Sequence, residues 1–511
     1  MRFVPIVGHF QPDPPSAMLR DVESLSTAIL RERPELAMPD DFRRLSAEQV
    51  GEGPTLHVDD LTAISRLDPG CRTEFYQDRA RLRAGDGDIV VSCGQPVGGY
   101  EEYCCEMLGL GSPKWLHPRV PQNPMRVAEA SWEDRSVRRT LVRAIRSRDL
   151  EYLHPHMGTL PIWELAFLLH RASHRRIRVV APPPNVTTWA NDKVAFTTTV
   201  QRLFGESFVP TSESAWNLSK LALRVQEIAR QSQFVGLKLP DAAGGDGNVV
   251  IKSGRFGDQS LRQTHSILRE ALQKLDWDGC SELLVDSWES NVTSSPSVQM
   301  WIPPQDEGPP VIEGLFVQVI EGAQGIFTGS RPADLPSHLT EEIVDRCWLL
   351  GQLFQHVGYL GRCSFDMILV GDTHDNCQIE FIECNGRWGG TSLPMTLMNR
   401  LFGDWSRQPF AVSVSWIPGL DRVSFVDALN AFGDDLFDAR TGQGRFILCN
   451  PGRMKHQSGL SAIGLGSTWD EAATAAFEDF PARLRDLVAG HAGDAADTSK
   501  IPGAIKPRSS T

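Results

Sequence analysis

The sequence lacks the cysteine patterns of zinc-binding proteins. Its ten cysteines are scattered, and none forms a Cys-x-x-Cys pair or joins a cysteine–histidine cluster with zinc-ligand spacing. Several lie in apolar runs, where a free cysteine packs as a small hydrophobic residue. The sequence therefore predicts no zinc site, and it favours a reducing compartment, the cytoplasm.

Long apolar runs and excess positive charge are also missing. No run of about 18 apolar residues occurs, and the start MRFVPIVGHFQPDPP has no charged segment followed by a long apolar stretch. We therefore expect neither a membrane span nor a secretory signal. The formal net charge of -13 and the pI near 5.5 argue against nucleic acid and membrane surfaces as partners. Eleven arginines between Arg126 and Arg178 are the local exception: they form either a solvated helical surface or a surface that receives an acidic peptide.

No side-chain set for covalent catalysis can be recognised. The sequence shows no Ser/His/Asp or Cys/His arrangement and no internal repeats. The Gly-rich turn at 240–248 is not a Walker A motif, which needs Gly-Lys-Ser/Thr at the start of a helix, and it is not a Rossmann fingerprint. A P-loop enzyme and a nucleophile-dependent hydrolase are therefore disfavoured.

Length and composition predict several domains in an α/β (α+β) chain. Near the start, a short buried strand at 88–93 leads through a tight loop into a helix at 101–110, which is half of a βαβ unit. The triple proline at 182–184 is the best boundary signal. The expected units are an α/β domain at 1–185, a second domain at 186–420, a small α+β unit at 421–490, and a disordered tail at 491–511.

The second domain contains a clear hairpin pattern. Two strands at 363–370 and 378–384 flank the polar turn 371–376. An amphipathic helix at 340–357 precedes them, because apolar residues recur at i, i+4, i+7 and i+11 from Ile343. Further strands are expected between 234 and 330.

The second strand of this hairpin ends in Glu-x-Asn and runs into Gly-Arg-Trp-Gly-Gly. Because strand side chains alternate faces with a period of two, Glu383 and Asn385 project from one face and Glu380 from the other. A carboxylate and an amide oxygen so placed can bind Mg²⁺ (or Mn²⁺), which keeps company with phosphates. Neighbouring antiparallel strands are only about 5 Å apart, so Asp366 on the first strand can share the cation. A buried strand with a polar end is the alternative.

Two arginines are candidates for contacts with an anion. Arg387 follows the Glu-x-Asn strand directly, and Arg331 follows a strand expected at 325–330. A surface loop arginine is the alternative for Arg331.

The Gly-rich turn is a candidate phosphate-binding element. Backbone N–H groups approach phosphate oxygens closely where no Cβ blocks them. Lys238, at the end of the preceding strand, adds a fixed positive charge. The members of this candidate site are Lys238, Gly244, Gly245, Gly247 and Asn248. A plain β-turn is the alternative.

A strand at 283–285 leaves its sheet into a polar stretch that contains Asp286, Trp288 and Glu289. Such a segment can offer backbone groups to an adenine edge and a carboxylate to a ribose hydroxyl. An ordinary strand end is the alternative.

Taken in order, these features resemble the ATP-grasp superfamily over about residues 190–400. The resemblance implies a Rossmann-like pre-ATP-grasp domain at 1–185 and an ATP-grasp domain at 186–420, with a lid at about 186–302 and a metal-binding sheet at about 303–420. The resemblance implies that Lys193 and Lys238 hold the nucleotide phosphates, that residues 286–289 form the hinge, that Asp366, Glu383 and Asn385 bind the metal, and that Arg387 faces the transferred phosphate. Two departures stand out. The hinge usually has a glutamate where Asp286 stands, so Glu289 is the alternative ribose ligand. Ser364 stands where ligases of the D-alanyl-D-alanine type carry arginine, so Arg362 or Arg331 is expected to supply that charge.

The stretch 292–299 and the Gly-Arg-Trp-Gly-Gly turn are similar, more narrowly, to the peptide ligases of pheganomycin biosynthesis and their actinobacterial relatives. This resemblance implies ATP-dependent formation of a peptide bond through an acyl phosphate. An amino acid, nonproteinogenic in that family, supplies the carboxylate, and a peptide supplies the amine. A ligase for single amino acids and a non-catalytic ATP-binding module are the alternatives. A homodimer is a further expectation.

Overall fold

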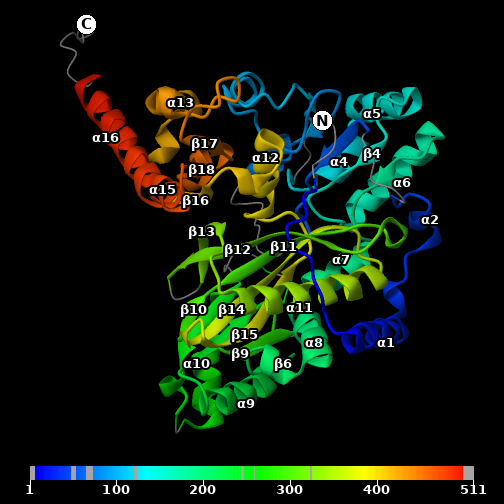
Figure 1. Cartoon of the computed structure of the whole chain (residues 1–511), viewed down its shortest axis with the longest axis vertical. Coiled ribbons are helices and arrows are strands. Elements are labelled where there is room, and N and C mark those ends of the chain that lie inside the picture. The colour runs from blue at the N-terminus through cyan, green and yellow to red at the C-terminus, as the bar shows by residue number, and fades with distance from the viewer. Residues whose placement is uncertain are drawn as a thin grey trace, which may run out of the picture.

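The computed structural model describes residues 6–47, 53–64, 73–119, 123–240, 242, 247–257, 259–279, 281–322 and 325–498. Within these residues the strands form three sheets, and the chain is a mixed α/β protein, as predicted (Figure 1). No helix in the described ranges is long and apolar enough to cross a membrane.

The N-terminal sheet is parallel and has the strand order β3-β2-β1-β4-β5. Its strands are β1 (Thr55–Val58), β2 (Ile89–Val91), β3 (Lys114–Leu116), β4 (Tyr152–Leu153) and β5 (Arg178–Val179). Helices α4 (Val127–Glu133), α5 (Arg135–Ser147) and α6 (Leu160–Ser173) pack their apolar sides into its core. The strand order reverses between β1 and β4, and ligands of such sheets bind outside the carboxyl ends of the strands at this point. Leu61 and His156, which follow these two strands, line the main cavity.

The smallest sheet is antiparallel and lies at the bottom of Figure 1. Its order is β6 (Ser212–Ala215), β9 (Leu283–Ser287), β7 (Phe234–Lys238) and β8 (Asn248–Lys252). Helices α9 (Leu218–Ala229) and α10 (Leu261–Gln273) share an apolar core with it. A capping box formed by Ser260 and Gln263 begins α10.

The central sheet has nine strands and crosses the middle of the molecule (Figure 1). Its antiparallel order is β10 (Val292–Ser294), β14 (Gly361–Thr373), β11 (Pro296–Ile302), β12 (Val311–Glu321), β13 (Ile326–Pro332), β16 (Phe410–Trp416), β18 (Gly459–Leu465) and β17 (Phe446–Cys449), and β15 (Asn376–Asn385) pairs with β14. Helices α1 (Ser16–Glu32), α7 (Pro184–Asn191), α8 (Lys193–Phe204) and α11 (Ser337–His356) contribute to its core. The predicted hairpin and the predicted helix before it are thus both present. The strands β17 and β18 extend this same sheet, although their segment was expected as a unit of its own.

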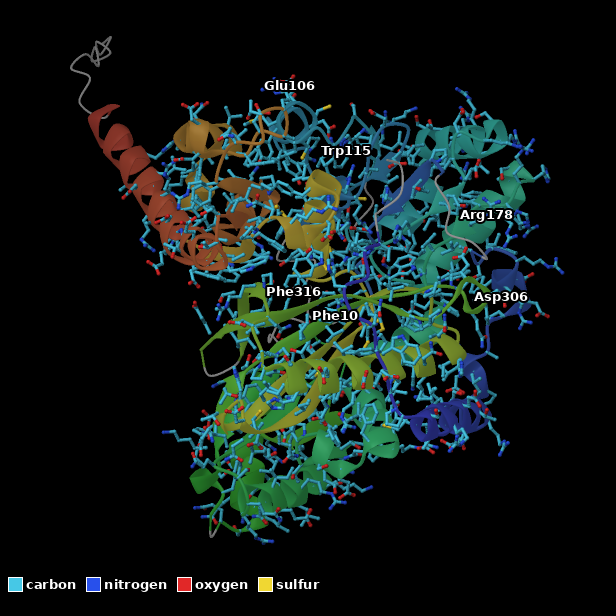
Figure 2. All side chains as sticks on the ribbon, in the orientation of Figure 1. Phe10, Glu106, Trp115, Arg178, Asp306 and Phe316 are labelled. Carbon is cyan, nitrogen blue, oxygen red and sulfur yellow. The ribbon has the colours of Figure 1, made fainter. Side chains whose placement is uncertain are left out.

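A segment of the N-terminal domain and a segment of the C-terminal part of the chain pack against each other. The helical segment Thr73–Leu82 contacts α14 (Gly452–Gln457), and a Cβ on Gly452 would lie 2.7 Å from the Cβ of Phe75. A shared apolar core joins Leu82 and Tyr103 to the C-terminal strands. In Figure 2 the side chain of Phe316 lies in the interior beneath this layer, whereas Glu106 and Asp306 lie at the outside. The cavity described below therefore has one wall built from segments of the N-terminal and C-terminal parts of the chain.

Two local expectations differ in detail from the structure. The helix predicted at 101–110 is present as a short α-helix, Tyr100–Glu102, that continues as a π-helical turn, Tyr103–Met107. The tail predicted to be disordered from 491 is helical as far as Thr498, where it continues α16 (Phe480–Thr498). Residues 499–511 lie outside the described part of the chain.

Candidate functional site

A cavity of about 1200 Å³ lies between the three sheets. Small-molecule sites usually measure about 300–1,000 Å³, so this cavity has room for more than one ligand. Eleven of the site residues predicted from the sequence line it: Lys193, Lys238, Gly247, Asn248, Trp288, Glu289, Arg331, Asp366, Glu383, Asn385 and Arg387.

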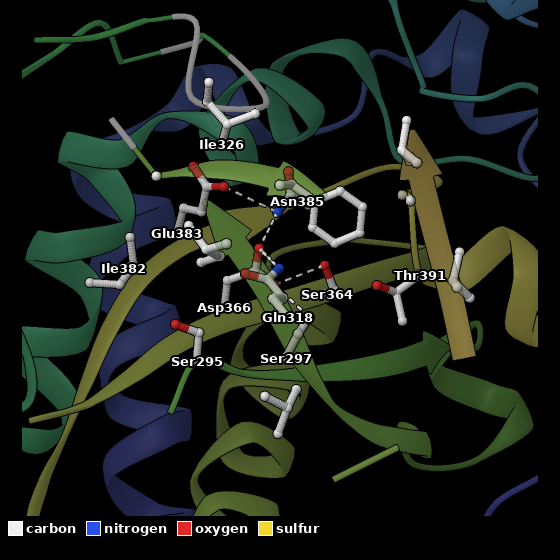
Figure 3. A pocket seen from close by; sticks show the side chains of 18 of the residues that line it. Ser295, Ser297, Gln318, Ile326, Ser364, Asp366, Ile382, Glu383, Asn385 and Thr391 are labelled. Atoms are coloured by element: carbon white, nitrogen blue, oxygen red, sulfur yellow. Dashed lines mark hydrogen bonds between the residues drawn. The ribbon is translucent and has the colours of Figure 1, made fainter. Parts of the chain in front are cut away.

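Asp366, Glu383 and Asn385 meet on the hairpin of β14 and β15. Asp366 lies opposite Glu383 in the register, and Ser364 lies opposite Asn385. The amide nitrogen of Asn385 donates to Asp366 Oδ2 at 2.8 Å and approaches Glu383 Oε1 at 3.4 Å. Figure 3 shows the three side chains pointing toward one another. Two carboxylates and one amide are thus gathered on one face of the sheet.

A β-bulge places Glu380 on this same face, contrary to the prediction. The register shifts just after the Asp366–Glu383 pair, and Ile368 then lies opposite Glu380. Two positions separate the partners on β14, but three separate them on β15, so the extra residue reverses the alternation. Burial and the nearby carboxylate of Glu289 raise the pKa of Glu380 to about 7. The alternation of side chains with a period of two therefore holds from Glu383 to Asn385, at the end of the strand, and is interrupted between Glu383 and Glu380.

Asp366 is held by donors that the sequence did not reveal. Ser297 Oγ on β11 donates to its Oδ1 at 2.6 Å, and Gln318 Nε2 on β12 donates to its Oδ2 at 2.9 Å (Figure 3). Burial, reinforced by the charge of Glu383, raises the pKa of Asp366 to about 6. The sequence does carry one signal for Gln318, because it is the only polar residue in the apolar strand at 315–320 and a buried polar group needs a partner.

Lys193 joins the start of α8 to the acidic cluster. Its Nζ lies 3.0 Å from Glu383 Oε2 and donates to the carbonyl of Ala242 at 2.6 Å. Burial would raise the pKa of Glu383, but the charges of Lys193 and Arg387 outweigh it and lower that pKa. Asp192 caps the helix by accepting from the backbone N–H of Ala195 at 2.8 Å. The lysine is therefore fixed at the cavity by the helix terminus.

Lys238, Asp286 and Trp288 form a second cluster on the small sheet. Lys238 Nζ is ion-paired with Asp286 and lies 5.1 Å from the centre of the Trp288 ring. Asp286 is only 2% exposed and packs so closely under Gly236 that a Cβ there would lie 2.2 Å from Asp286 Oδ1. Asp286 thus holds the lysine from behind the cavity wall and is poorly placed for ribose. Glu289 lines the cavity and is the available carboxylate.

The Gly-rich turn is described only at its edges. Gly244 and Gly245 lie outside the described residues. Gly247 lines the cavity, and Asn248 begins β8 opposite Lys238. These two residues lie beside the lysine, where a phosphate-binding turn requires them.

Asn191, the last residue of α7, connects the segment that follows β15 to that helix. Its Oδ1 accepts from the backbone N–H of Gly386 at 3.0 Å and from the guanidinium of Arg387, and its Nδ2 donates to the carbonyl of Thr187 at 2.8 Å. The segments joined in this way are 195 residues apart. Asn191 therefore positions Arg387 against the cluster, and its place two residues before Lys193 was the only sequence signal.

The two other arginines proposed for the site differ in position. Arg331 is exposed at the end of β13 and lines the cavity. Arg362 does not, because its guanidinium is fully buried, lies 2.8 Å from Glu313 Oε1 and stacks 4.6 Å from the centre of the Trp388 ring. The positive charge of Arg362 is therefore paired with Glu313 in the core and does not face the cavity.

The donor set suits a hard divalent cation. No cluster of three histidine, cysteine, aspartate or glutamate side chains fit for a metal occurs in the described ranges. A metal at this site would accordingly rest on two carboxylates and one amide oxygen, which are oxygen ligands of the kind that Mg²⁺ and Mn²⁺ prefer. The raised pKa of Asp366 fits this role, because a cation would offset the repulsion from Glu383.

The architecture of this chain was compared with those of known proteins. Residues 77–170 match the sequence family described as Pre ATP-grasp domain. No curated protein matches the chain significantly. Among solved structures, N5-carboxyaminoimidazole synthetase from Staphylococcus aureus, complexed with ADP, is similar with a TM-score of 0.50 and 10% identity, over 86% of this chain and 99% of that one.

Two further solved structures have lower TM-scores. The biotin carboxylase domain of 2-oxoglutarate carboxylase from Hydrogenobacter thermophilus gives 0.48 with 13% identity, over 82% of this chain and 87% of that one. N5-carboxyaminoimidazole synthase from Aspergillus clavatus gives 0.47 with 13% identity, over 86% and 99%. The Staphylococcus aureus structure and the pre-ATP-grasp match identify the architecture as the ATP-grasp fold, with a Rossmann-like domain before it.

Proposed function

We propose that this protein is an ATP-dependent carboxylate–amine ligase that uses Mg²⁺ or Mn²⁺. The observation that carries the proposal is the pairing of Asp366 with Glu383 across the hairpin, with Lys193 3.0 Å from Glu383, on the wall of a large cavity. Fixed cations beside a divalent-metal ligand set are what a nucleotide polyphosphate requires.

Different residues of the site would bind different parts of ATP. Lys193 and Lys238 hold the phosphates, and Trp288 and Glu289 lie where the adenine and ribose would bind. Asp366, Glu383 and Asn385 would hold the metal, which when bound supplies positive charge that offsets the developing charge on the phosphates. Arg387, fixed by Asn191, adds a cation on the side of the transferred phosphoryl group.

The reaction needs activation because a carboxylate is a poor electrophile. A substrate carboxylate oxygen attacks the γ-phosphorus, the bond to the ADP oxygen breaks, and an acyl phosphate forms. The amine nitrogen then attacks the acyl carbon, the bond to the phosphate oxygen breaks, and the nitrogen loses a proton as inorganic phosphate leaves. The chain supplies positioning and fixed charge, so no nucleophilic side chain is required.

The solved structures support ATP as the nucleotide and ligation as the class of reaction. The Staphylococcus aureus synthetase is complexed with ADP, and the Hydrogenobacter thermophilus domain with MgADP and bicarbonate. We propose an amino acid as the carboxylate donor and a peptide as the amine acceptor, in the biosynthesis of a peptide natural product. The cavity, larger than one small-molecule site, supports an acceptor longer than a single amino acid.

Nucleotide binding is tested first, without any substrate. ADP with Mg²⁺ should raise the melting temperature more than ADP alone, because the acidic cluster contributes only with the metal. Glu383→Gln and Asn385→Ala should remove this difference. Asp375→Asn, an exposed change on the same hairpin, should keep it. An unchanged metal effect in the Glu383 and Asn385 variants would overturn the assignment.

Turnover is tested with amino acids as donors and peptides, single amino acids or no amine as acceptors. A ligase releases ADP only when donor and acceptor are both present, and mass spectrometry should find the acceptor extended by one residue. ADP release without an amine would identify a carboxylate kinase instead. Products with single amino acids only would identify a dipeptide ligase, and binding without turnover in any mixture would favour a non-catalytic module.

A further inference from the structure

Tyr76 lies between two arginines on the cavity wall where the segment Thr73–Leu82 meets α14. The Arg79 guanidinium lies 5.4 Å from the centre of its ring, and the Arg453 guanidinium lies 5.2 Å from it. The Tyr76 hydroxyl accepts from Arg453 Nη2 at 2.6 Å. Tyr76 and Arg79 come from the segment Thr73–Leu82, and Arg453 comes from α14. All three side chains line the cavity.

Neither arginine has a carboxylate partner among the described residues. Arg453 is only 9% exposed, and the Nε atoms of Arg453 and Arg79 are buried without an acceptor. The nearby carboxylate of Asp59 is ion-paired with Arg83 instead. Arg453 is buried and Arg79 is half-buried. Two such cations around one ring repel each other unless an anion joins them, and charges removed from water are normally paired.

The pair lies close to the proposed reaction centre. Arg79 Nη2 donates to the carbonyl of Gly389 at 3.4 Å. Gly389 follows Arg387 by two residues, which spans at most about 7 Å of chain. The pair is therefore close enough to Arg387 for one substrate molecule to reach both. The arginine-rich stretch 126–178 offers no alternative, because none of its arginines is among the described residues that line the cavity.

We propose that Arg79, Tyr76 and Arg453 form a binding subsite for a carboxylate of the substrate, distinct from the carboxylate that is activated. Arginine is suited to this role because its planar fork binds a carboxylate through two hydrogen bonds. Asn450 adds an acceptor, since its Oδ1 is buried without a partner in the described chain and the residue lines the cavity. A carboxylate that carries a nearby N–H group, as in an amino acid or a peptide, fits this set. The inference rests on the proposed ligase function, because it names what that substrate must carry.

The carboxylate has two possible sources, which matched probes separate. Succinate and its monoamide succinamate represent a donor with a second carboxylate. Alanyl-alanine and its C-terminal amide represent an acceptor. Binding is measured by ligand-observed NMR on the full chain saturated with ADP and Mg²⁺. The probe with the extra carboxylate should bind at least about tenfold more tightly than its amide in one of the two pairs, corresponding to roughly 1.4 kcal/mol.

This preference should depend on both arginines. Arg79→Met and Arg453→Met should each abolish it, and Arg453→Lys should keep part of it. Arg440→Met, which changes an exposed arginine, should leave it intact. Retention of ADP binding shows that each variant is folded. Tyr76→Phe keeps the ring and removes the hydroxyl that holds Arg453, and it should weaken the preference.

Equal binding of the acid and the amide in both pairs would overturn the proposal, as would a preference that survives both methionine variants. Binding of inorganic phosphate without any carboxylate preference would also overturn it. The ligase function fails separately, if ADP and Mg²⁺ do not bind to the unmodified chain.

Discussion

Lys193 Nζ lies 3.0 Å from Glu383 Oε2, so the charge at the start of helix α8 is paired with the acid at the end of strand β15. The side chain of Lys193 is 7% exposed and that of Glu383 is 22% exposed, and both face the cavity. The same lysine also donates to the carbonyl of Ala242, beside the Gly-rich turn. One cation thus connects the two parts of the proposed nucleotide site before any ligand arrives.

This pairing predicts strong coupling between the two residues. Lys193→Met should destabilise the ligand-free protein, because it leaves the Glu383 carboxylate half-buried and unpaired. Adding Glu383→Gln should restore part of the loss, with a coupling energy of roughly 0.5–3 kcal/mol in a double-mutant cycle of urea unfolding. Additive effects of the two changes would show that the pair is not formed in solution.

Asn191 should affect turnover more than nucleotide binding. Asn191→Ala removes the acceptor that orients Gly386 and Arg387. The turnover rate should fall by about 10–100-fold, the usual effect of removing an orienting partner, while the affinity for ADP with Mg²⁺ changes little. Asn185→Ala, an exposed change on the same helix, is the matched control. A loss of ADP affinity as large as the loss of rate would contradict the positioning role.

The buried pair of Arg362 and Glu313 should support the fold rather than the chemistry. Both side chains are fully buried and 2.8 Å apart. Arg362→Met should lower the free energy of unfolding by about 3–5 kcal/mol, because it leaves a buried carboxylate unpaired. Adding Glu313→Gln should recover much of this loss. Arg440→Met at an exposed ion pair should cause no measurable change, and an equal effect of both arginine changes would contradict the interpretation.

Asp78 should make the stability depend on pH. Burial raises its pKa to about 7 in the folded chain, whereas an unfolded aspartate ionises near pH ~4. Between these values the folded state holds a proton that the unfolded state has lost, so stability falls as the pH rises through this window and stays low above it. Asp78→Asn should make the decline smaller, since Glu380 and Asp366 also have raised pKa values. At pH 8 it should raise the melting temperature, with a gain in the free energy of unfolding of up to about 4 kcal/mol.

The control for this pH effect is Asp434→Asn, which changes an exposed aspartate. Its melting temperature should follow that of the unmodified chain from pH 4 to pH 8. A decline of undiminished size in Asp78→Asn would assign the pH dependence to other groups.

Local sequence pattern determined much of this protein. The helix at 340–357 followed from apolar spacing and the hairpin at 363–384 from two strands around a polar turn, and both are present. The shared face of Glu383 and Asn385 followed from the period of a strand, which is a property of neighbouring residues alone. The mixed α/β class followed for the same reason, because strand and helix periods are local signals.

Tertiary structure decided what those local patterns could not. The bulge in β15 depends on the register with β14, so it moved Glu380 to the face of Asp366 without any change in local pattern. Asp286 became the partner of Lys238 because the neighbouring strands β7 and β9 placed the two side chains together behind the cavity wall. The Arg79–Tyr76–Arg453 group needs the first and last parts of the chain to meet. Contacts between distant segments carry no period or spacing in the sequence, and only packing of the whole chain brings them together.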